Sequence, residues 1–466
     1  MKRLGFALAV LALTASPAAA QSFSERFETI KREATPEELY RILYRVPKGG
    51  DLHNHLGGAA YDDMLWELAT DTSVNGNQTF HTRVRMNACE RTCPQPLIYF
   101  HTIGETSWQE LPECCREEYE PLTELSAAKR EAWLSSTRID QEGEGRAEFF
   151  EIIWPRIGEV LAQAHLVAEI AVLNMELFAA EGVRYIEFQI GPWNRRDGDR
   201  ALTDDEFHDI VAARLEREDA KATGVTVRFQ PNVVRFLPNA EALVEQGFAF
   251  VDRHRDLWSS VNLVGREDND KGYPLRFLPT FRKMRRLYPR IPLSIHGGEV
   301  DEPNHHVRDT LLLGADRIGH GTNLITDPET LLLMRIGKFA IEVSLVSNLL
   351  LDYVERAEEH PFAEYLRLGI PVTLATDDRG MWNSNMTDEY FSAVTAFNLS
   401  WDELVTVGRY SLEFAFVPDA VKAELLDDYE RDIRAFVEEY SEGNFREHAL
   451  RVPVNISGFA RAHLLR

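Results

Sequence analysis

Residues 183–190 read Val-Arg-Tyr-Ile-Glu-Phe-Gln-Ile, a run of β-branched and aromatic residues with the length of one buried β-strand. Helix-like amphipathic segments precede it at residues 156–180 and follow it at residues 204–222. Strands that are separated by helices pair in parallel, because each helix carries the chain back across the sheet. This stretch therefore predicts an α/β protein with a parallel sheet.

Short apolar runs of the same kind recur on both sides of this strand. The other predicted strands are residues 50–56, 225–234, 260–265, 291–296, 317–320, 339–345 and 371–376. Eight alternating units favour a closed (β/α)8 barrel of the TIM type over an open doubly wound sheet. We expect residues 21–466 to form this single barrel domain.

A long segment separates the first predicted strand, which ends at residue 56, from the second, which begins at residue 183. It contains every cysteine and several polar stretches, so we predict an inserted subdomain at about residues 61–150, over one mouth of the barrel. Residues 421–439 are acidic and helix-like. The region from about residue 417 is therefore predicted to be a C-terminal helical extension.

The first twenty residues have the order of a secretory signal peptide. Lys2 and Arg3 precede an apolar run at residues 4–13, and three alanines end at Ala20. The run is too short to span a bilayer, and no later run approaches the roughly 18 residues that a membrane span needs. We predict cleavage after Ala20 and a periplasmic or secreted protein. The alternative is a disordered or anchored N-terminus.

The cysteines are clustered within the predicted insertion, and an even number in an exported chain indicates disulfides. They are Cys89, Cys93, Cys114 and Cys115. A bridge between the two adjacent cysteines would be strained, so we predict two bridges that link this pair to Cys89 and Cys93. The alternative is a four-thiolate zinc site, which adjacent ligands fit poorly.

The overall charge narrows the choice of partners. The chain has 51 Lys and Arg against 75 Asp and Glu, for a net charge of -24. This field repels phosphate backbones and anionic lipids, so neither nucleic acid nor a membrane surface is a predicted partner. With 44% hydrophobic and 27% charged residues, a disordered or collagen-like chain is excluded as well.

The first candidate metal-binding residues lie in His53-Asn54-His55, at the end of the first predicted strand. Residues two apart on a strand point to the same side, so both imidazoles can face the barrel interior and share one metal ion. A His-x-His pair also occurs by chance, as two core or surface histidines. On its own, the pair does not distinguish a metal site from two structural histidines.

Three further segments carry polar side chains at the C-terminal ends of predicted strands, where barrel active sites are built. They are residues 294–299 (SIHGGE), 317–321 (RIGHG) and 376–378 (TDD). Histidines with a carboxylate suit zinc and leave one position open for water. Glu299, three residues after His296, could reach the same pocket.

These segments, in this order, resemble the adenosine deaminase family of metal-dependent amidohydrolases. The motifs that carry the resemblance are PKGGDLHNHLGGA (47–59), SIHGGEV (294–300), RIGHGT (317–322) and VTLATDD (372–378). The signal peptide, the cysteine-bearing insertion and the opening PKGG look more like the secreted branch, the adenosine deaminase-related growth factors. The resemblance implies the barrel fold, one zinc ion per chain and hydrolytic deamination of a purine nucleoside.

The resemblance also implies a role for each site residue. The implied zinc ligands are His53, His55, His296 and Asp377. Glu299 would protonate the purine ring, and His320 would orient and deprotonate the water that zinc holds. Asp378 would hydrogen-bond the imidazole-ring nitrogen, and the backbone amide of Gly265 would contact the pyrimidine ring.

The reaction needs these residue types independently of any family. Zinc lowers the pKa of bound water to about 7. Attack at an aromatic carbon that carries an amino group breaks the ring conjugation, so a carboxylic acid must protonate the adjacent ring nitrogen. A Glu that its surroundings keep neutral can do this.

Two positions depart from the family pattern. Short members commonly have an Asp, which contacts the ribose 5′-hydroxyl, where this chain has Gly57, and Arg379 stands where Pro is common. The residues that would contact the sugar are therefore not assigned by these motifs. We expect the remaining histidines to be structural or solvated, with the first two of this list as the best candidates for an exception: His305, His306, His165, His208, His254, His360, His448 and His463.

The sequence thus predicts an exported zinc-dependent adenosine deaminase, which converts adenosine or 2′-deoxyadenosine to the inosine form and ammonia. One alternative is an amidohydrolase that deaminates another aminopurine or aminated heterocycle, which Gly57 makes plausible. The other is a secreted nucleoside-binding or growth-factor-like protein. Such a protein should have lost a ligand or the acid, whereas this chain has all of them. The oligomeric state is left open.

Overall fold

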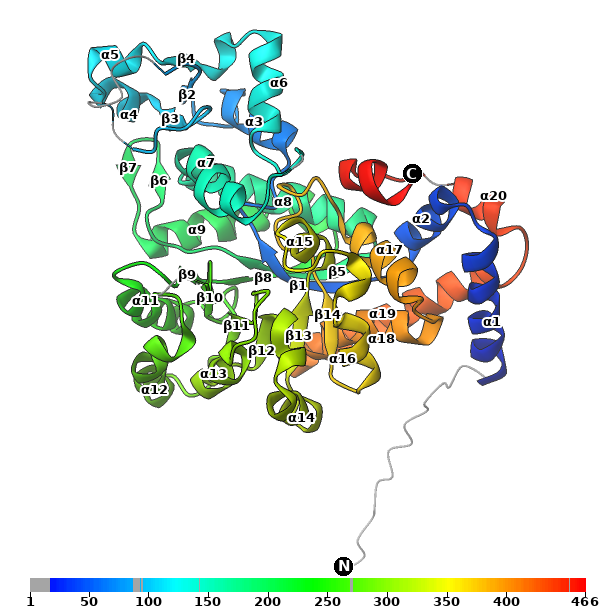
Figure 1. Ribbon diagram of the computed structural model, residues 1–466. Coiled ribbons are helices and arrows are strands. Elements are labelled where there is room, and N and C mark those ends of the chain that lie inside the picture. The colour runs from blue at the N-terminus through cyan, green and yellow to red at the C-terminus, as the bar shows by residue number, and fades with distance from the viewer. Residues whose placement is uncertain (1–16, 87–92, 94, 142, 269–270, 452) are drawn as a thin grey trace, which may run out of the picture.

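Parallel strands form a ring at the centre of the computed structural model, which describes residues 17–86, 93, 95–141, 143–268, 271–451 and 453–466 (Figure 1). Two sheets make most of the ring, in the orders β1-β5-β8 and β11-β12-β13-β14, and β9-β10 lies between them. The strands are β1 (Gly49–His55), β5 (Val183–Gln189), β8 (Thr226–Gln230), β9 (Asn232–Val234), β10 (Asn262–Val264), β11 (Ser294–Gly297), β12 (Arg317–His320), β13 (Ala340–Val343) and β14 (Val372–Leu374).

Isolated parallel bridges join these sheets. Asn54 at the end of β1 pairs with Asp377 after β14, Val261 pairs with Leu293, and Phe229 pairs with Trp258. The ring of parallel strands is therefore continuous, as a (β/α)8 barrel of the TIM type requires.

One predicted strand is divided in two. The expected strand at residues 225–234 breaks at Pro231, where β8 ends and β9 begins. Proline has no backbone N–H to donate to a sheet. Because of this break, β8 pairs with β5 while β9 pairs with β10, so the chain bends from one barrel sheet to the next.

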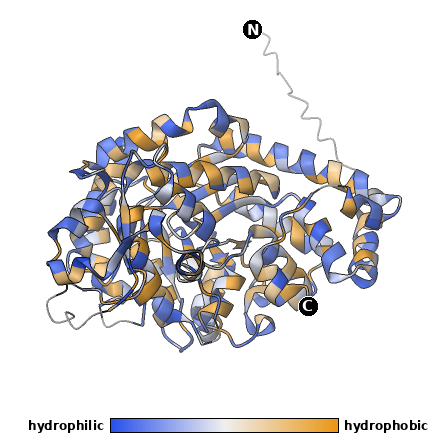
Figure 2. Cartoon of the chain, turned by 90° about the horizontal axis from the view of Figure 1, so that it is seen from above, coloured by the Kyte–Doolittle hydropathy of each residue, from blue (hydrophilic) through white to orange (hydrophobic). Residues whose placement is uncertain are grey.

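Helices surround the strands, and several carry both polar and apolar residues around their axes (Figure 2). They include α9 (Asp204–Leu215), α11 (Ala240–Arg253), α12 (Leu278–Leu287), α13 (His306–Leu313), α14 (Pro328–Ile336), α15 (Leu345–Leu350), α16 (Phe362–Arg367), α17 (Met386–Phe397) and α18 (Trp401–Glu413). The predicted helix at 156–180 is two helices, α7 (Trp154–Leu161) and α8 (Ala164–Ala180). Similarly, residues 204–222 form α9 and α10 (Glu218–Ala222), because the backbone of Arg217 is extended.

The segment between β1 and β5 contains a small antiparallel sheet of its own, in the order β3-β2-β4 (Figure 1). A separate apolar cluster that includes Ile103, Leu111 and Tyr119 packs there. The elements of this segment, before α7, are α3 (Asp62–Thr70), β2 (Phe80–Arg83), β3 (Thr102–Gly104), α4 (Glu105–Glu110), α5 (Glu113–Arg116), β4 (Tyr119–Pro121), the 3-10 helix η1 (Leu122–Glu124), α6 (Ala127–Ser135) and the π-helix η2 (Glu148–Ile153).

A disulfide between Cys93 and Cys115 lies in the same cluster. This pairing agrees with the prediction that one cysteine of the adjacent pair bonds to Cys93, and it excludes a bridge between Cys114 and Cys115. Cys114 is also disulfide-bonded, while Cys89 lies outside the described residues. Since Cys93 and Cys115 are bonded to each other, the structure gives no support to a four-thiolate zinc site.

Both ends of the described chain pack on one side of the barrel. The helices α1 (Pro17–Glu33) and α2 (Pro36–Arg45) lie near α19 (Asp419–Ser441) and α20 (Phe445–Leu450). Phe23 of α1 packs edge-on against Trp401 at 4.7 Å between ring centroids, and Trp401 stacks on Phe436 of α19 at 5.4 Å. The predicted C-terminal helix is therefore part of the core. Within the described residues, no helix has the length and apolar character of a membrane span.

Candidate active site

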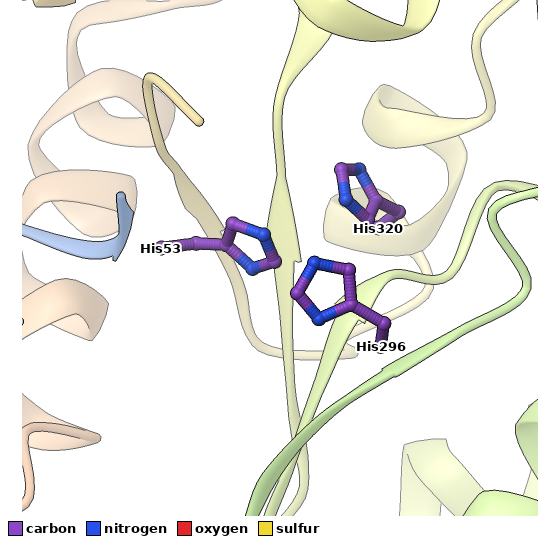
Figure 3. A group of neighbouring side chains, drawn as sticks. All are labelled: His53, His296 and His320. Atoms are coloured by element: carbon purple, nitrogen blue, oxygen red, sulfur yellow. The ribbon is translucent and has the colours of Figure 1, made fainter. Parts of the chain in front are cut away.

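The predicted metal ligands come together at the C-terminal ends of the barrel strands. His53 and His55 lie on β1 and His296 on β11, and Asp377 follows β14. The imidazole rings of His53, His296 and His320 face one another from three different strands (Figure 3). The side chains of all five residues are buried or nearly so, and their positions depend on closure of the barrel between β14 and β1.

The donor atoms of the four predicted ligands converge on a small space. His55 Nε2 lies 3.2 Å from His296 Nε2 and 3.3 Å from Asp377 Oδ1. His53 Nε2 lies 3.5 Å from the same Asp377 oxygen. Both His53 Nε2 and Asp377 Oδ1 are buried with no hydrogen-bond partner. Such atoms are expensive to bury unless a cation binds between them, and this donor set fits zinc.

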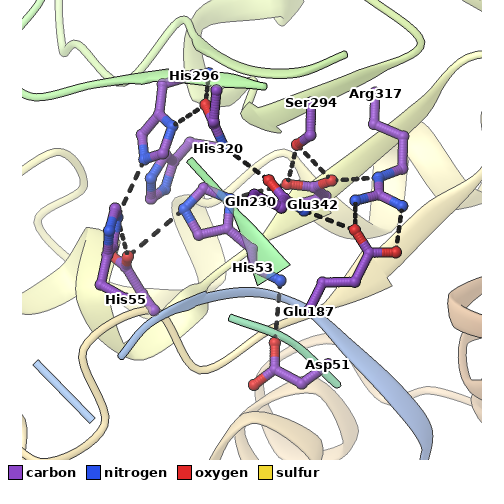
Figure 4. Close-up of polar contacts among 12 residues, drawn as sticks. Asp51, His53, His55, Glu187, Gln230, Ser294, His296, Arg317, His320 and Glu342 are labelled. Atoms are coloured by element: carbon purple, nitrogen blue, oxygen red, sulfur yellow. Dashed lines mark hydrogen bonds and ion pairs between the residues drawn. The ribbon is translucent and has the colours of Figure 1, made fainter. Parts of the chain in front are cut away.

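Neighbouring side chains fix which nitrogen of each ring faces this space (Figure 4). His53 Nδ1 lies 2.8 Å from Glu342 Oε2, and His296 Nδ1 lies 3.1 Å from Asn262 Oδ1. Because both partners are acceptors, each Nδ1 carries a hydrogen and each Nε2 keeps its lone pair for a metal. Ser347 Oγ donates to Asp377 Oδ2 at 2.6 Å and leaves Oδ1 free.

Glu342 is held ionised behind the ligands. Burial alone would raise the pKa of its carboxyl, but Arg317 and His53 outweigh this effect and lower the pKa to about 2. Burial lowers the pKa of His53, whereas Asp377 and Glu342 raise it, with a net pKa of about 10 in the absence of metal. A cation at His53 Nε2 would therefore take the place of a proton.

Glu299 lies beside these ligands, with Oε2 at 3.7 Å from His320 Nε2. Burial raises the pKa of its carboxyl well above the usual range, and the charges of Asp377 and Glu267 raise it further. The loop that carries Glu299 is fixed, because the Glu267 carboxylate accepts the backbone N–H groups of Gly298 and Glu299, each at 3.1 Å. Glu299 is thus a buried carboxyl group that faces the metal-binding space, and its surroundings favour the protonated form.

Asp378 and Gly265, the residues implied to read the purine, line the same pocket as Glu299. Burial raises the pKa of Asp378 well above its usual range, followed by the charge of Asp377. Gly265 has φ +87°, and a Cβ there would come within 3.0 Å of the Phe236 ring. Gly58 is equally constrained, because a Cβ there would overlap the Asp378 carboxylate.

Two residues of the site have backbone conformations that are rare for their type. His320 has φ +64° and Asp377 has φ +54°, both in the left-handed region. Such conformations each cost about 1–3 kcal/mol and concentrate at functional sites. His320 ends β12 and Asp377 lies three residues after β14, and each directs a polar side chain into the pocket.

The pocket has a volume of about 240 Å³, and its wall away from the metal ligands is aromatic. Phe149 and Phe150 of η2 and Trp154 of α7 form this wall. Ion pairs tie the same segment to barrel loops, from Arg146 to Asp301 at 2.7 Å and from Arg266 to Glu151 at 3.1 Å. Sequence analysis did not identify the aromatic residues individually, since only their place at the end of the insertion pointed to them.

The remaining predicted positions lie outside the pocket lining. Arg379 forms a buried ion pair with Glu181 and packs over the Phe178 ring, so its role is structural. His305 contacts Asp327, and His306 Nδ1 lies 2.8 Å from Glu267. His306 therefore contacts the carboxylate that holds the loop of Glu299, and this contact is structural.

Comparisons with known proteins identify the family of this chain. The family model described as adenosine deaminase matches residues 98–431. An adenosine deaminase from Vibrio vulnificus (strain YJ016) is 31% identical over 271 residues, which cover 58% of this chain and 79% of the relative.

Two solved structures share the fold. Arabidopsis ADAL in complex with IMP has a TM-score of 0.60 at 19% identity, covering 84% of this chain and 99% of that chain. An amidohydrolase from Burkholderia ambifaria with bound zinc has a TM-score of 0.61 at 19% identity, covering 87% and 95%. On the family match and the fold, the chain belongs to the adenosine deaminase family and is a hydrolase that acts on C–N bonds.

Proposed function

We propose that this protein is an exported, zinc-dependent deaminase of neutral purine nucleosides, with adenosine and 2′-deoxyadenosine as substrates. The observation that carries the proposal is the buried carboxyl of Glu299, whose pKa is raised by burial, in one pocket with an arrangement of three imidazoles and one carboxylate. Amidohydrolytic attack on an aminopurine needs both features in one pocket.

His53, His55, His296 and Asp377 would hold the zinc ion, which supplies a water of lowered pKa. Other residues of the chain supply the proton transfer and position the substrate. Glu299 delivers a proton to the ring nitrogen beside the reacting carbon, while Asp378 and the backbone amide of Gly265 hold the purine in place. The left-handed backbone at Gly265 supports this role, since it turns the chain sharply at the pocket.

The pocket lining supports a neutral substrate. Of the residues that the structure describes, no lysine or arginine lines this pocket. A phosphate buried against the aromatic wall would have no cation to pair with, which costs several kcal/mol. We therefore favour nucleosides over AMP, although a structural neighbour was solved with IMP. The expected partner is a small purine nucleoside, which binds at one site per chain.

Export is supported by two observations. The first twenty residues have the pattern of a signal peptide, and Cys93 and Cys115 form a disulfide, which persists in oxidising compartments. The resemblance to the secreted growth-factor branch points in the same direction. Because all ligands and the acid are present, we favour an active enzyme over a binding protein.

A substrate panel tests the proposal. Purified zinc-loaded protein is incubated with adenosine, 2′-deoxyadenosine, adenine, AMP and guanosine, and ammonia is measured. We expect kcat/KM for the two adenine nucleosides to exceed that for AMP by at least about a hundredfold, in line with the cost of an unpaired buried charge. Faster turnover of adenine would favour the alternative, an amidohydrolase of another aminopurine. No ammonia from any compound would support a nucleoside-binding protein.

A further inference from the structure

A chain of buried hydrogen bonds runs behind the pocket from the backbone of Phe362 to His320. The Phe362 N–H lies 3.1 Å from His360 Nδ1, and His360 Nε2 lies 3.0 Å from Asn348 Oδ1. Asn348 Nδ2 in turn lies 3.1 Å from His320 Nδ1. The side chains of His360, Asn348 and His320 are at most 3% exposed, so water does not compete for these bonds.

The Phe362 N–H fixes which group donates in each hydrogen bond of this series. A backbone N–H can only donate, so His360 Nδ1 accepts, and a neutral His360 carries its hydrogen on Nε2. Burial keeps His360 neutral, since it lowers the pKa to about 3. His360 Nε2–H therefore donates to Asn348 Oδ1.

The orientation of the Asn348 side-chain amide then determines whether His320 Nδ1 donates or accepts. Asn348 Oδ1 accepts from His360 and also from the Thr322 hydroxyl, at 3.1 Å. The amide nitrogen is left to donate to His320 Nδ1, which must then be an acceptor. A neutral His320 consequently carries its hydrogen on Nε2, the nitrogen that faces the pocket.

We propose that Asn348 and His360 are positioning residues that hold His320 in this tautomer, so that His320 donates a hydrogen bond to the attacking oxygen instead of removing its proton. The inference rests on the proposed deaminase function. His320 Nε2 is buried without a partner, so its N–H has no acceptor until an oxygen enters the pocket. A donor placed there stabilises the negative charge that develops on that oxygen.

The proton of the attacking water then goes to Glu299, whose Oε2 lies 3.7 Å from His320 Nε2. As the new C–O bond forms, Glu299 gives its proton to the ring nitrogen and accepts one from the water, so its carboxyl is unchanged overall. The second water proton moves to the amino group, the C–N bond breaks, and ammonia leaves. The atoms balance without His320 as a base.

The variant Asn348→Asp separates the two roles. Its carboxylate can still accept from His360 and Thr322, but it cannot donate to His320, so His320 Nδ1 must carry a hydrogen. At a pH where nitrogen-15 NMR shows the ring to be neutral, Nε2 is then left bare, and the comparison of kcat is made at that pH. If His320 is a donor, we expect kcat for adenosine to fall by at least about a hundredfold, as for the loss of one oxyanion donor, with KM and zinc content near the values of the unmodified protein. If His320 is a base, N348D should preserve or raise kcat.

Thr322→Val is the matched control, because it removes another hydrogen bond to the same Asn348 oxygen without changing the direction of the chain. We expect its kcat to change by less than about threefold. If T322V lost as much kcat as N348D, the role of Asn348 would be structural only, and the proposal would be overturned.

The tautomer of His320 can also be determined independently of turnover, by nitrogen-15 NMR of histidine-labelled, zinc-loaded protein. The His320 signals are identified by their absence in His320→Gln, and we expect a protonated Nε2 and a bare Nδ1. The opposite pattern would overturn the inference, even if N348D failed to fold. If no nucleoside were turned over while the NMR pattern held, the proposed function would fail and the tautomer assignment would stand.

Discussion

The Trp154 ring occupies the space into which a side chain on residue 57 would project. A Cβ built on Gly57 would lie 3.1 Å from Trp154 Cζ3 and 2.9 Å from Leu161 Cδ1. An aspartate at this position, which contacts the ribose in short family members, would not fit without movement of both side chains. Gly57 and the aromatic wall are therefore packed against each other, and under the proposed function they would leave the ribose without a carboxylate acceptor at residue 57.

From this relationship we predict that the enzyme tolerates loss of the 5′-hydroxyl. A site that hydrogen-bonds a hydroxyl rejects analogues without it, because its polar groups are left unpaired, whereas the rings of Phe149 and Phe150 have no polar group to leave unpaired. We expect kcat/KM for 5′-deoxyadenosine to be within about tenfold of adenosine, or about 1.4 kcal/mol. A loss of a thousandfold or more would mean that the insertion supplies another acceptor. Trp154→Ala should weaken both substrates alike.

We predict that activity depends on one zinc ion per chain. Chelation should abolish turnover and zinc should restore it, and Asp377→Asn should lose the metal because Oδ1 no longer carries charge toward three imidazoles. Metal content by mass spectrometry and ammonia release are the measurements. The exposed His165 provides a control, since His165→Ala should retain both. Full activity of rigorously metal-free protein would contradict the site assignment.

We predict that Glu299→Gln separates catalysis from metal binding. The amide keeps the size but cannot deliver a proton, so turnover should fall by at least about a hundredfold while zinc content stays near normal. If this variant lost its zinc, Glu299 would be a ligand and not the acid.

The same residue predicts the alkaline side of the pH profile. Glu299 acts in its protonated form, and burial raises its pKa, so the acid is present below the raised pKa and activity is lost as pH rises through it. The residual rate of Glu299→Gln should lack this decline. A profile of kcat against pH for the two proteins is the measurement, and an unchanged alkaline decline in the variant would assign it to another group.

The cysteines predict an oxidised insertion. Intact-mass analysis of exported protein should give a chain four hydrogens lighter than its reduced form, with Gln21 at the N-terminus. Because the Cys93–Cys115 bridge spans 22 residues, removing it with Cys93→Ser should destabilise the fold by about 3 kcal/mol, measured by denaturant unfolding. Four free thiols, or an extra zinc released by thiol alkylation, would contradict the pairing.

Much of the fold could be predicted from local sequence. The strand at 183–190 was predicted within a residue of its observed ends, because a buried parallel strand is a short run of apolar and β-branched residues that can be recognised locally. The division of residues 225–234 at Pro231 was also present in the sequence, since proline cannot continue a sheet ladder. The two helices within residues 156–180 were not, because a tertiary contact decides their boundary: Gly198 N–H donates to the Gln163 side chain between them.

The sequence by itself determined the residue types of the site and the strand ends that carry them. His53, His296, Glu299, His320 and Asp377 are recognisable because a parallel barrel brings all strand C-termini to one rim. Only the tertiary structure decided that Trp154 fills the space beside Gly57 and that His360, predicted to be structural, directs the hydrogen of His320 through Asn348. The physical reason is distance along the chain: packing and hydrogen-bond direction arise between residues that no local pattern connects.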